Sequence, residues 1–180
     1  MDLVILARDG VLNEDRADFV RSPGQGGPVP GSLEAKARLC EAGLRVAVAT
    51  NQSGIGRGLY DEAALAAIHR RMRSEIIKYG GDLDEIVYCP HHPDDDCDCR
   101  KPRAGLLQQL AASYDRSLKG VPCIGDAQRD LEAAAAVGAR PILVLTGKGR
   151  ATLEALGDPA PEYYSNLSTA VDRLLGEDPP

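Results

Sequence analysis

Polar side chains gather directly after three short apolar stretches of this chain. Each stretch is typical of a strand buried on both faces, and the carboxyl ends of parallel strands meet at the edge where open α/β sheets bind ligands. Carboxylates, a hydroxyl, an amide and a lysine together suit a magnesium ion and the oxygens of a phosphoryl group. The groups are Arg8-Asp9-Gly10 after residues 3–6, Thr50-Asn51 after residues 44–49, Gly125-Asp126 with Asp130 after residues 121–124, and Lys101 in the loop before a predicted helix.

Nitrogen and sulfur donors form a second cluster, in the irregular loop of residues 89–99. The loop holds three of the five cysteines, an odd number that suits a metal in a reducing compartment better than a disulfide framework. A Cys-x-Cys pair is also poorly placed to bond with itself. Three thiolates and one imidazole satisfy tetrahedral zinc and leave no open position, so we expect a structural zinc ion. The expected ligands are Cys89, His91, Cys97 and Cys99, with His92 as the alternative nitrogen donor, while Cys40 and Cys123 are expected in the core.

The elements that must position these groups alternate between strand and helix. Five such alternations indicate right-handed βαβ crossovers and a mostly parallel sheet covered on both faces. Residues 14–29 are polar and rich in Gly and Pro, which predicts a loop or flap rather than an inserted cap domain. The chain is therefore expected to form one α/β domain over residues 1–180. Strands are predicted at 3–6, 44–49, 84–89, 121–124 and 142–145, and helices from Ser32 to Gly43 and at 62–79, 104–114 and 128–137, with one or two short helices and a polar Asp-Pro-Pro tail after them.

Composition narrows the class of protein further. The chain has 180 residues, of which 43% are hydrophobic, enough for a substantial core, and no apolar run approaches the length of a membrane-spanning helix. A formal net charge of −6 disfavours a general nucleic-acid-binding protein. The first residues lead directly into a predicted strand, without the basic and apolar regions of a signal peptide. We therefore expect a cytoplasmic protein that binds a small molecule, with no nucleic-acid or membrane partner, and, because the expected cap is minimal, a monomer.

Taken in order, the polar groups resemble the four motifs of the haloacid dehalogenase (HAD) superfamily. The resemblance covers nearly the whole chain and implies a HAD-like Rossmannoid three-layer sandwich with minimal cap loops. Any one motif is weak evidence, whereas the ordered set is specific. The matching positions are Ala7-Arg8-Asp9-Gly10 for the first motif, Thr50-Asn51-Gln52-Ser53 for the second, Lys101 for the third, and Gly125-Asp126 with Asp130 for the fourth.

By the mechanism that the resemblance implies, the residue at position 7 attacks phosphorus, and Asp9 protonates the leaving alcohol and then activates water. The backbone carbonyl of Asp9 and the carboxylate of Asp126 would hold magnesium, while Asp130 would lie behind the metal ligands or orient Lys101. The residues expected to bind substrate are Thr50, Asn51 and Lys101, which would hold the phosphoryl group, and Arg8, Asn13, Gln52 and Ser53 beside them.

Position 7 departs from the pattern, because Ala7 stands where the family has an aspartate. A methyl group neither attacks phosphorus nor ligates a metal. Loss of the nucleophile from a coupled catalytic set costs on the order of 10⁴–10⁶ in rate, so we expect a nearly inactive chain. Two explanations stay open: a deliberate replacement that traps intact substrate, and a natural binding protein without catalysis. Every other motif residue is present, which favours the first.

The cysteine loop narrows the resemblance to two related groups of HAD phosphatases, which act on a heptose bisphosphate and on histidinol phosphate. The stretches most similar to the heptose group are residues 8–13, 51–58 and 97–102. Arg57 and Arg100 would suit a second, uncleaved phosphate through bidentate contacts, and histidinol phosphate has none. The implied reaction removes the C7 phosphate of D-glycero-D-manno-heptose 1,7-bisphosphate to give the 1-phosphate, a step toward ADP- or GDP-heptose. Hydrolysis of histidinol phosphate and non-catalytic binding of a sugar phosphate are the alternatives.

Overall fold

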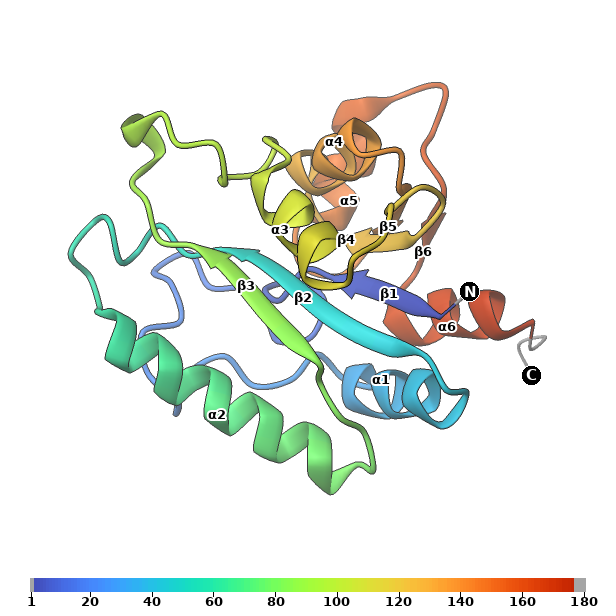
Figure 1. The fold of residues 1–180 in the computed structure, drawn as a ribbon, viewed down its shortest axis with the longest axis horizontal. Coiled ribbons are helices and arrows are strands. Elements are labelled where there is room, and N and C mark those ends of the chain that lie inside the picture. Colours follow the sequence, from blue (N-terminus) through green and yellow to red (C-terminus); the bar gives the residue numbers. More distant parts are fainter. Residues whose placement is uncertain (1, 177–180) are drawn as a thin grey trace.

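Strand β1, Leu3–Leu6, lies inside a parallel sheet, and its side chains are buried. The computed structural model describes residues 2–176. The other strands are β2 (Arg45–Asn51), β3 (Glu85–Cys89), β4 (Pro122–Gly125), β5 (Arg140–Val144) and β6 (Tyr163–Tyr164). Within the described range the sheet has six strands in the order β3-β2-β1-β4-β5-β6 (Figure 1). The strand order reverses between β1 and β4, which is the switch point where open α/β sheets bind ligands.

Helices cover the sheet on both faces and make it the middle of three layers (Figure 1). One face carries α1 (Ser32–Glu41), α2 (Glu62–Lys78) and α6 (Leu167–Leu175), and the other carries α3 (Gly105–Ser113) and α4 (Gln128–Ala136). Along β1, Val4 and Leu6 join the core on the α1 side, whereas Leu3 and Ile5 join the core on the α3 side. This alternation follows from the two-residue period of a strand. Helix α5 (Gly149–Leu156) follows β5, and the short 3₁₀ helix η1 (Pro93–Asp95) lies in the loop after β3.

The predicted HAD-like α/β sandwich with a parallel sheet is confirmed. The sequence did not predict β6, because a strand of two residues is too short to show a period. Strand β2 continues to Asn51, past the predicted end at Ala49, so Thr50 and Asn51 are held by pairing with β3. One domain over residues 1–180 stays a prediction, and the Asp-Pro-Pro tail lies outside the described residues. Among the helices of residues 2–176, none is long and apolar enough to cross a membrane.

The polar segment of residues 14–29 forms the predicted loop, here called the flap. Two contacts connect it to later parts of the chain. The ring of Phe19 lies 5.8 Å from the guanidinium carbon of Arg57, and the carboxylate of Asp15 lies 3.2 Å from Nζ of Lys148. The flap therefore reaches residues that follow β2 and β5, at the carboxyl edge of the sheet.

Candidate active site and metal centre

Ala7 follows β1 at the carboxyl edge of the sheet, where its backbone is fixed. Its N–H donates to the carbonyl of Ile124 on β4 over 2.8 Å, and the residue is 8% exposed. A small cavity beside Ala7 is also lined by Lys101 and Asp130. A longer side chain at position 7 would therefore lie close to the lysine that is expected to hold a phosphoryl group.

Three side chains donate hydrogen bonds to the carboxylate of Asp9. Arg8 donates from Nε and Nη2 over 2.9–3.1 Å. Asn13 donates from Nδ2 to Oδ1 over 2.8 Å, and Gln52 donates from Nε2 to Oδ2 over 3.1 Å. The sequence places Asn13 and Gln52 beside substrate, and the structure places both against Asp9. The direction of the expected acid–base carboxylate is thus fixed by its neighbours.

Arg8 is almost fully buried, at 1% exposed, and its guanidinium is engaged on two sides. One side meets Asp9, and Nη1 on the other lies 3.2 Å from Nε2 of His69 on α2. Burial lowers the pKa of His69 to about 3, and the cation of Arg8 contributes in the same direction. The ring is therefore neutral and able to accept a hydrogen bond. A direct contact between Arg8 and substrate would require breaking these interactions.

Lys101 reaches the same edge of the sheet from the loop before α3. Its Nζ donates to the carbonyl of Ala49 over 2.8 Å and lies 2.6 Å from Oδ1 of Asp130. Asn51 holds the lysine backbone on both sides: its Nδ2 donates to the Lys101 carbonyl over 3.1 Å, and its Oδ1 accepts the Lys101 N–H over 3.0 Å. The hydroxyl of Thr50 accepts a hydrogen bond from Nε2 of Gln52 over 2.8 Å. These contacts hold the three expected phosphoryl-binding residues side by side.

Asp126 and Asp130 approach this group from β4 and from α4. Oδ2 of Asp130 accepts the backbone N–H groups of Asp126 and Ala127 over 3.2 and 3.1 Å. Burial raises the pKa of Asp130, but the Lys101 ammonium outweighs this effect and holds that pKa below its usual range. For Asp126, burial dominates and raises the pKa to about 6. A cation bound at Asp126 would stabilise its charged form.

Two glycines let the backbone pack closely against the carboxylate of Asp126. A Cβ atom on Gly10 would lie 2.0 Å from Oδ2 of Asp126, and one on Gly147 would lie 2.3 Å from the same oxygen. The backbone N–H of Lys148 donates to Oδ2 over 2.9 Å, which leaves Oδ1 for a ligand. Together with the backbone carbonyl of Asp9, these oxygens fit Mg²⁺. The side chain of Ala7 supplies no oxygen, so the set is one carboxylate short of the set that the motif implies.

Three guanidinium groups form a cationic cluster next to Lys101, composed of Arg57, Arg100 and Arg129. Burial lowers the pKa of Arg100, and the nearby charges of Arg129 and Arg57 lower it further. Nη1 of Arg100 and Nε of Arg129 are buried without a hydrogen-bond partner in the described part of the chain. Arg57 donates from Nε to Oγ of Ser53 over a long 3.4 Å. Buried cationic N–H groups without partners are costly, so the cluster favours an anion.

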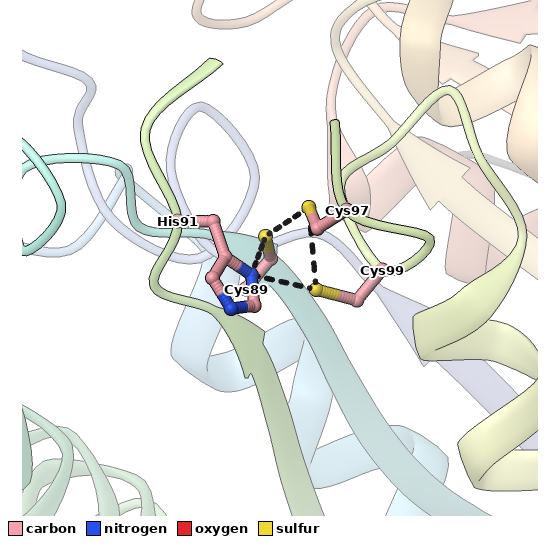
Figure 2. Close-up of side chains that lie close together, drawn as sticks. All are labelled: Cys89, His91, Cys97 and Cys99. Atoms are coloured by element: carbon pink, nitrogen blue, oxygen red, sulfur yellow. Dashed lines mark hydrogen bonds between the residues drawn. The ribbon is translucent and has the colours of Figure 1, made fainter. Parts of the chain in front are cut away.

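The four predicted zinc ligands come together, with the side chains of the loop facing a common point (Figure 2). Their ligand atoms, on Cys89, His91, Cys97 and Cys99, all lie within 4.8 Å of one another. Sγ atoms of Cys89 and Cys97 are 3.6 Å apart, and Nδ1 of His91 lies 3.2 Å from Sγ of Cys99. Zinc–sulfur bonds of about 2.3 Å place two tetrahedral sulfurs about 3.8 Å apart. Burial, reinforced by Cys89 and Cys97, raises the pKa of Cys99 to about 12 when no metal is bound, so a cation is needed to hold three thiolates together.

His92, the alternative donor, points elsewhere, because its Nδ1 accepts the backbone N–H of Asp94 over 3.1 Å. The loop of residues 89–99, here called the zinc loop, also packs tightly against the loop after β2. The N–H of Gly56 donates to the carbonyl of Pro90 over 2.8 Å, and a Cβ atom on Gly56 would lie 2.3 Å from the backbone nitrogen of His92. The zinc loop therefore fixes the backbone next to Arg57. Of the two remaining cysteines, Cys123 is buried as predicted, and Cys40 is half-buried at the edge of the core.

Sequence reasoning missed the loop after β5, residues 146–149. The hydroxyl of Thr146 donates to the carbonyl of Gly10 over 2.6 Å, and the N–H of Lys148 donates to Asp126. A signal was present, because a polar run that contains glycine follows an apolar strand here, as one does after β1. Arg129 and His69 were also missed, since each lies within a helix and reads as an ordinary polar helical residue.

Known proteins are similar to this chain in sequence and in fold. Residues 98–170 match the model of the HAD-hydrolase-like family. A crystal structure of D,D-heptose 1,7-bisphosphate phosphatase from Bordetella bronchiseptica, complexed with magnesium and phosphate, is 48% identical, has a TM-score of 0.94, and covers 99% of this chain and 100% of that one. The fold and the site define a HAD phosphatase, and thus a phosphoric monoester hydrolase by family.

Two bacterial relatives narrow the family. One from Pseudomonas aeruginosa is 50% identical over 176 residues, 96% of this chain and 97% of the relative. One from Pseudomonas putida is 53% identical over 175 residues, 97% of this chain and 100% of the relative. The chain belongs to the family that these relatives represent, the D-glycero-β-D-manno-heptose-1,7-bisphosphate 7-phosphatases.

Proposed function

We propose that this chain, with aspartate restored at position 7, removes the C7 phosphate of D-glycero-β-D-manno-heptose 1,7-bisphosphate and leaves the 1-phosphate. The observation that carries the proposal is the pair of adjacent anion sites. One is formed around Lys101, and the other consists of the guanidinium groups of Arg100 and Arg129, which have buried N–H groups without partners. A sugar bisphosphate satisfies both sites, whereas a monophosphate leaves one of them unsatisfied. The reaction would feed the synthesis of ADP- or GDP-heptose.

In the proposed first step, the carboxylate at position 7 attacks phosphorus while Lys101, Thr50 and Asn51 hold the phosphoryl oxygens. The bond from phosphorus to the C7 oxygen breaks, and Asp9 gives its proton to that oxygen. The sugar leaves as the 1-phosphate, and an aspartyl-phosphate stays on the protein. When bound by Asp126 and the Asp9 carbonyl, Mg²⁺ would neutralise negative charge on the phosphoryl group.

In the proposed second step, Asp9 acts in reverse. Its carboxylate takes a proton from a water molecule as the water attacks the phosphorus of the aspartyl-phosphate. Inorganic phosphate leaves, and both the position-7 carboxylate and protonated Asp9 are regenerated. Arg8, Asn13 and Gln52 support both steps by holding the Asp9 carboxylate in one place.

Ala7 stops the proposed reaction before the first bond to phosphorus forms. The rest of the phosphoryl-binding group is held by contacts that do not involve the Ala7 side chain, such as those between Asn51 and Lys101. The chain would therefore bind the bisphosphate without consuming it.

We also propose that it acts as a cytoplasmic monomer. The soluble sugar phosphate and the unpaired cysteines support the compartment, and the short flap, in place of a large cap, supports the monomer.

Phosphate release tests the proposed reaction. The chain as it stands and its Ala7→Asp variant would each be incubated with Mg²⁺ and heptose 1,7-bisphosphate, or with histidinol phosphate. We expect turnover by the Ala7→Asp variant, a preference for the heptose, and a rate lower by about 10⁴-fold or more with Ala7. Preference for histidinol phosphate would overturn the substrate, and no turnover of either compound would favour a natural binding protein.

Direct binding tests the second anion site without any turnover. Calorimetry on the Ala7 chain would compare heptose 1,7-bisphosphate with heptose 7-phosphate. We expect Arg129→Met to weaken binding of the bisphosphate about tenfold or more, because a charge-assisted hydrogen bond is lost, and to leave the monophosphate nearly unaffected. Arg150→Met is the matched control, since Arg150 is exposed and lies on α5. Equal weakening of both ligands would contradict the second site.

A further inference from the structure

His69 is a buried ionisable side chain with no part in the mechanism proposed above. It lies on α2 and is 9% exposed. Its Nε2 is 3.2 Å from Nη1 of Arg8, which is 61 residues away in the sequence. The ring also meets Tyr88 edge to face, with ring centroids 6.2 Å apart. A histidine packed against β3 on one side therefore contacts the first loop of the active site on the other.

The guanidinium of Arg8 connects His69 to Asp9. Nε and Nη2 donate to the Asp9 carboxylate over 2.9–3.1 Å, and Nη1 faces the imidazole. A guanidinium is planar and rigid, so an acceptor at one nitrogen fixes the direction of the other nitrogens. Arg8 itself is 1% exposed and reaches Asp9 from inside the protein. The imidazole thus fixes the plane of the group that holds Asp9.

The hydrogen bond also fixes the chemical form of His69. An arginine side chain has donors and no acceptor, so Nε2 of His69 must be unprotonated and Nδ1 carries the hydrogen. Burial and the cation of Arg8, with Arg73 adding to them, oppose a positive charge on the ring, while Asp9 favours it. The net effect keeps the imidazole neutral, as the acceptor role requires.

We propose that His69 is a positioning residue for the acid–base carboxylate Asp9, and that it acts through Arg8. The inference rests on the proposed role of Asp9 in protonating the C7 oxygen. Without an acceptor at position 69, the Arg8 guanidinium would rotate, and Asp9 would lose the direction that places its proton at the leaving oxygen. General acid catalysis contributes about 10²–10⁴-fold to such reactions, and a misplaced acid loses part of that factor.

Leaving-group dependence tests this inference, because 4-nitrophenolate leaves without protonation whereas a sugar alkoxide does not. In the Ala7→Asp protein, we expect His69→Leu to lower kcat/KM for heptose 1,7-bisphosphate by about 10- to 100-fold. For 4-nitrophenyl phosphate we expect less than about a threefold loss. The value of kcat/KM reports only the steps up to departure of the leaving group, and nitrophenolate departs without needing a proton from Asp9. His69→Gln keeps an acceptor and should recover most of the loss. Ile76→Val, a buried change about two turns further along the same helix, is the control.

Equal losses for both substrates, or no recovery with His69→Gln, would overturn the positioning role. A second measurement needs no turnover and uses the chain with Ala7. Nitrogen-15 spectra of the imidazole should show Nδ1 protonated and Nε2 unprotonated, and Arg8→Met should change the Nε2 signal. A proton on Nε2 would overturn the inference by itself. If the Ala7→Asp protein fails to hydrolyse the heptose substrate, the proposed function fails, and the spectra still decide the role of His69.

Discussion

Nζ of Lys101 lies 2.6 Å from Oδ1 of Asp130, and both side chains are almost fully buried. Breaking a buried ion pair by removing one partner leaves an uncompensated charge, which typically costs 3–5 kcal/mol. Replacing both partners with apolar groups often costs much less. The pair therefore holds the ammonium that we propose binds the phosphoryl group, at a position where neither charge is stable alone.

Lys101→Met should lower the free energy of unfolding by about 3 kcal/mol or more, because the Asp130 carboxylate stays buried without its ammonium. The double variant Lys101→Met/Asp130→Leu should regain a substantial part of that loss. Urea denaturation of the Ala7 chain measures both effects. A double variant no more stable than the single one would contradict the uncompensated-charge explanation.

Gly10→Ala should weaken Mg²⁺ binding by about tenfold or more, because the new Cβ would lie 2.0 Å from Oδ2 of Asp126 and would displace that carboxylate. Gly31→Ala is a matched control. Gly31 has nearly the same backbone φ, 78° against 80° for Gly10, but a Cβ there meets open space. Metal titration by calorimetry in the Ala7→Asp background checks the prediction. Equal effects of the two variants would assign the loss to backbone strain alone.

Removal of zinc should lower the melting temperature and weaken binding of the heptose bisphosphate, because the zinc loop lies between Arg57 and Arg100. Cys97→Ser should reproduce both effects and reduce the bound zinc measured by elemental analysis, since one ligand is lost. Cys40→Ser, outside the cluster, should retain zinc. Full zinc content in Cys97→Ser would contradict the four-ligand site.

The depressed pKa of His69 predicts that the protein loses stability in mild acid. An exposed histidine in the unfolded chain binds a proton below its ordinary pKa of 6.5, while folded His69 does so only near 3. The unfolded state therefore binds more protons as pH falls below 6.5, and folding stability drops by about 1.4 kcal/mol per pH unit. His69→Gln should flatten this slope between pH 6.5 and 5 in urea denaturation. Parallel slopes for the two proteins would count against a neutral buried ring.

The sequence was informative about most of the polar groups that follow a strand end and about donors that lie close together along the chain, although the loop after β5 was missed. Asp9, Thr50 and Asp126 each follow an apolar run, so the shared edge of a parallel sheet could be predicted from their positions alone. Cys97 and Cys99 could be assigned to a metal because the donors lie within one short loop. The metal-binding donors are close together along the chain, and the strand-end residues are brought together in space by the sheet.

The interactions that sequence could not supply join side chains across the fold. His69 meets Arg8 across 61 residues, and no local pattern on α2 marks it as different from its neighbours. Likewise, the sequence predicts that Asn13 binds substrate, whereas in the structure its Nδ2 donates a hydrogen bond to Asp9. Side chains that orient other side chains carry no signature of their own type or spacing, because any donor or acceptor at the right place would serve.

The contact between Gly56 and the zinc loop has a consequence for selectivity. The backbone of Gly56 contacts residues 90–92, and Arg100 directly follows the last cysteine, so a zinc ion bound by the four ligands would fix the chain on both sides of the cationic cluster. The interval between that cluster and Lys101 would then be constant from one molecule to the next. Zinc binding would then help to select among bisphosphates by the distance between their two phosphates, without any need for the ion to contact the ligand.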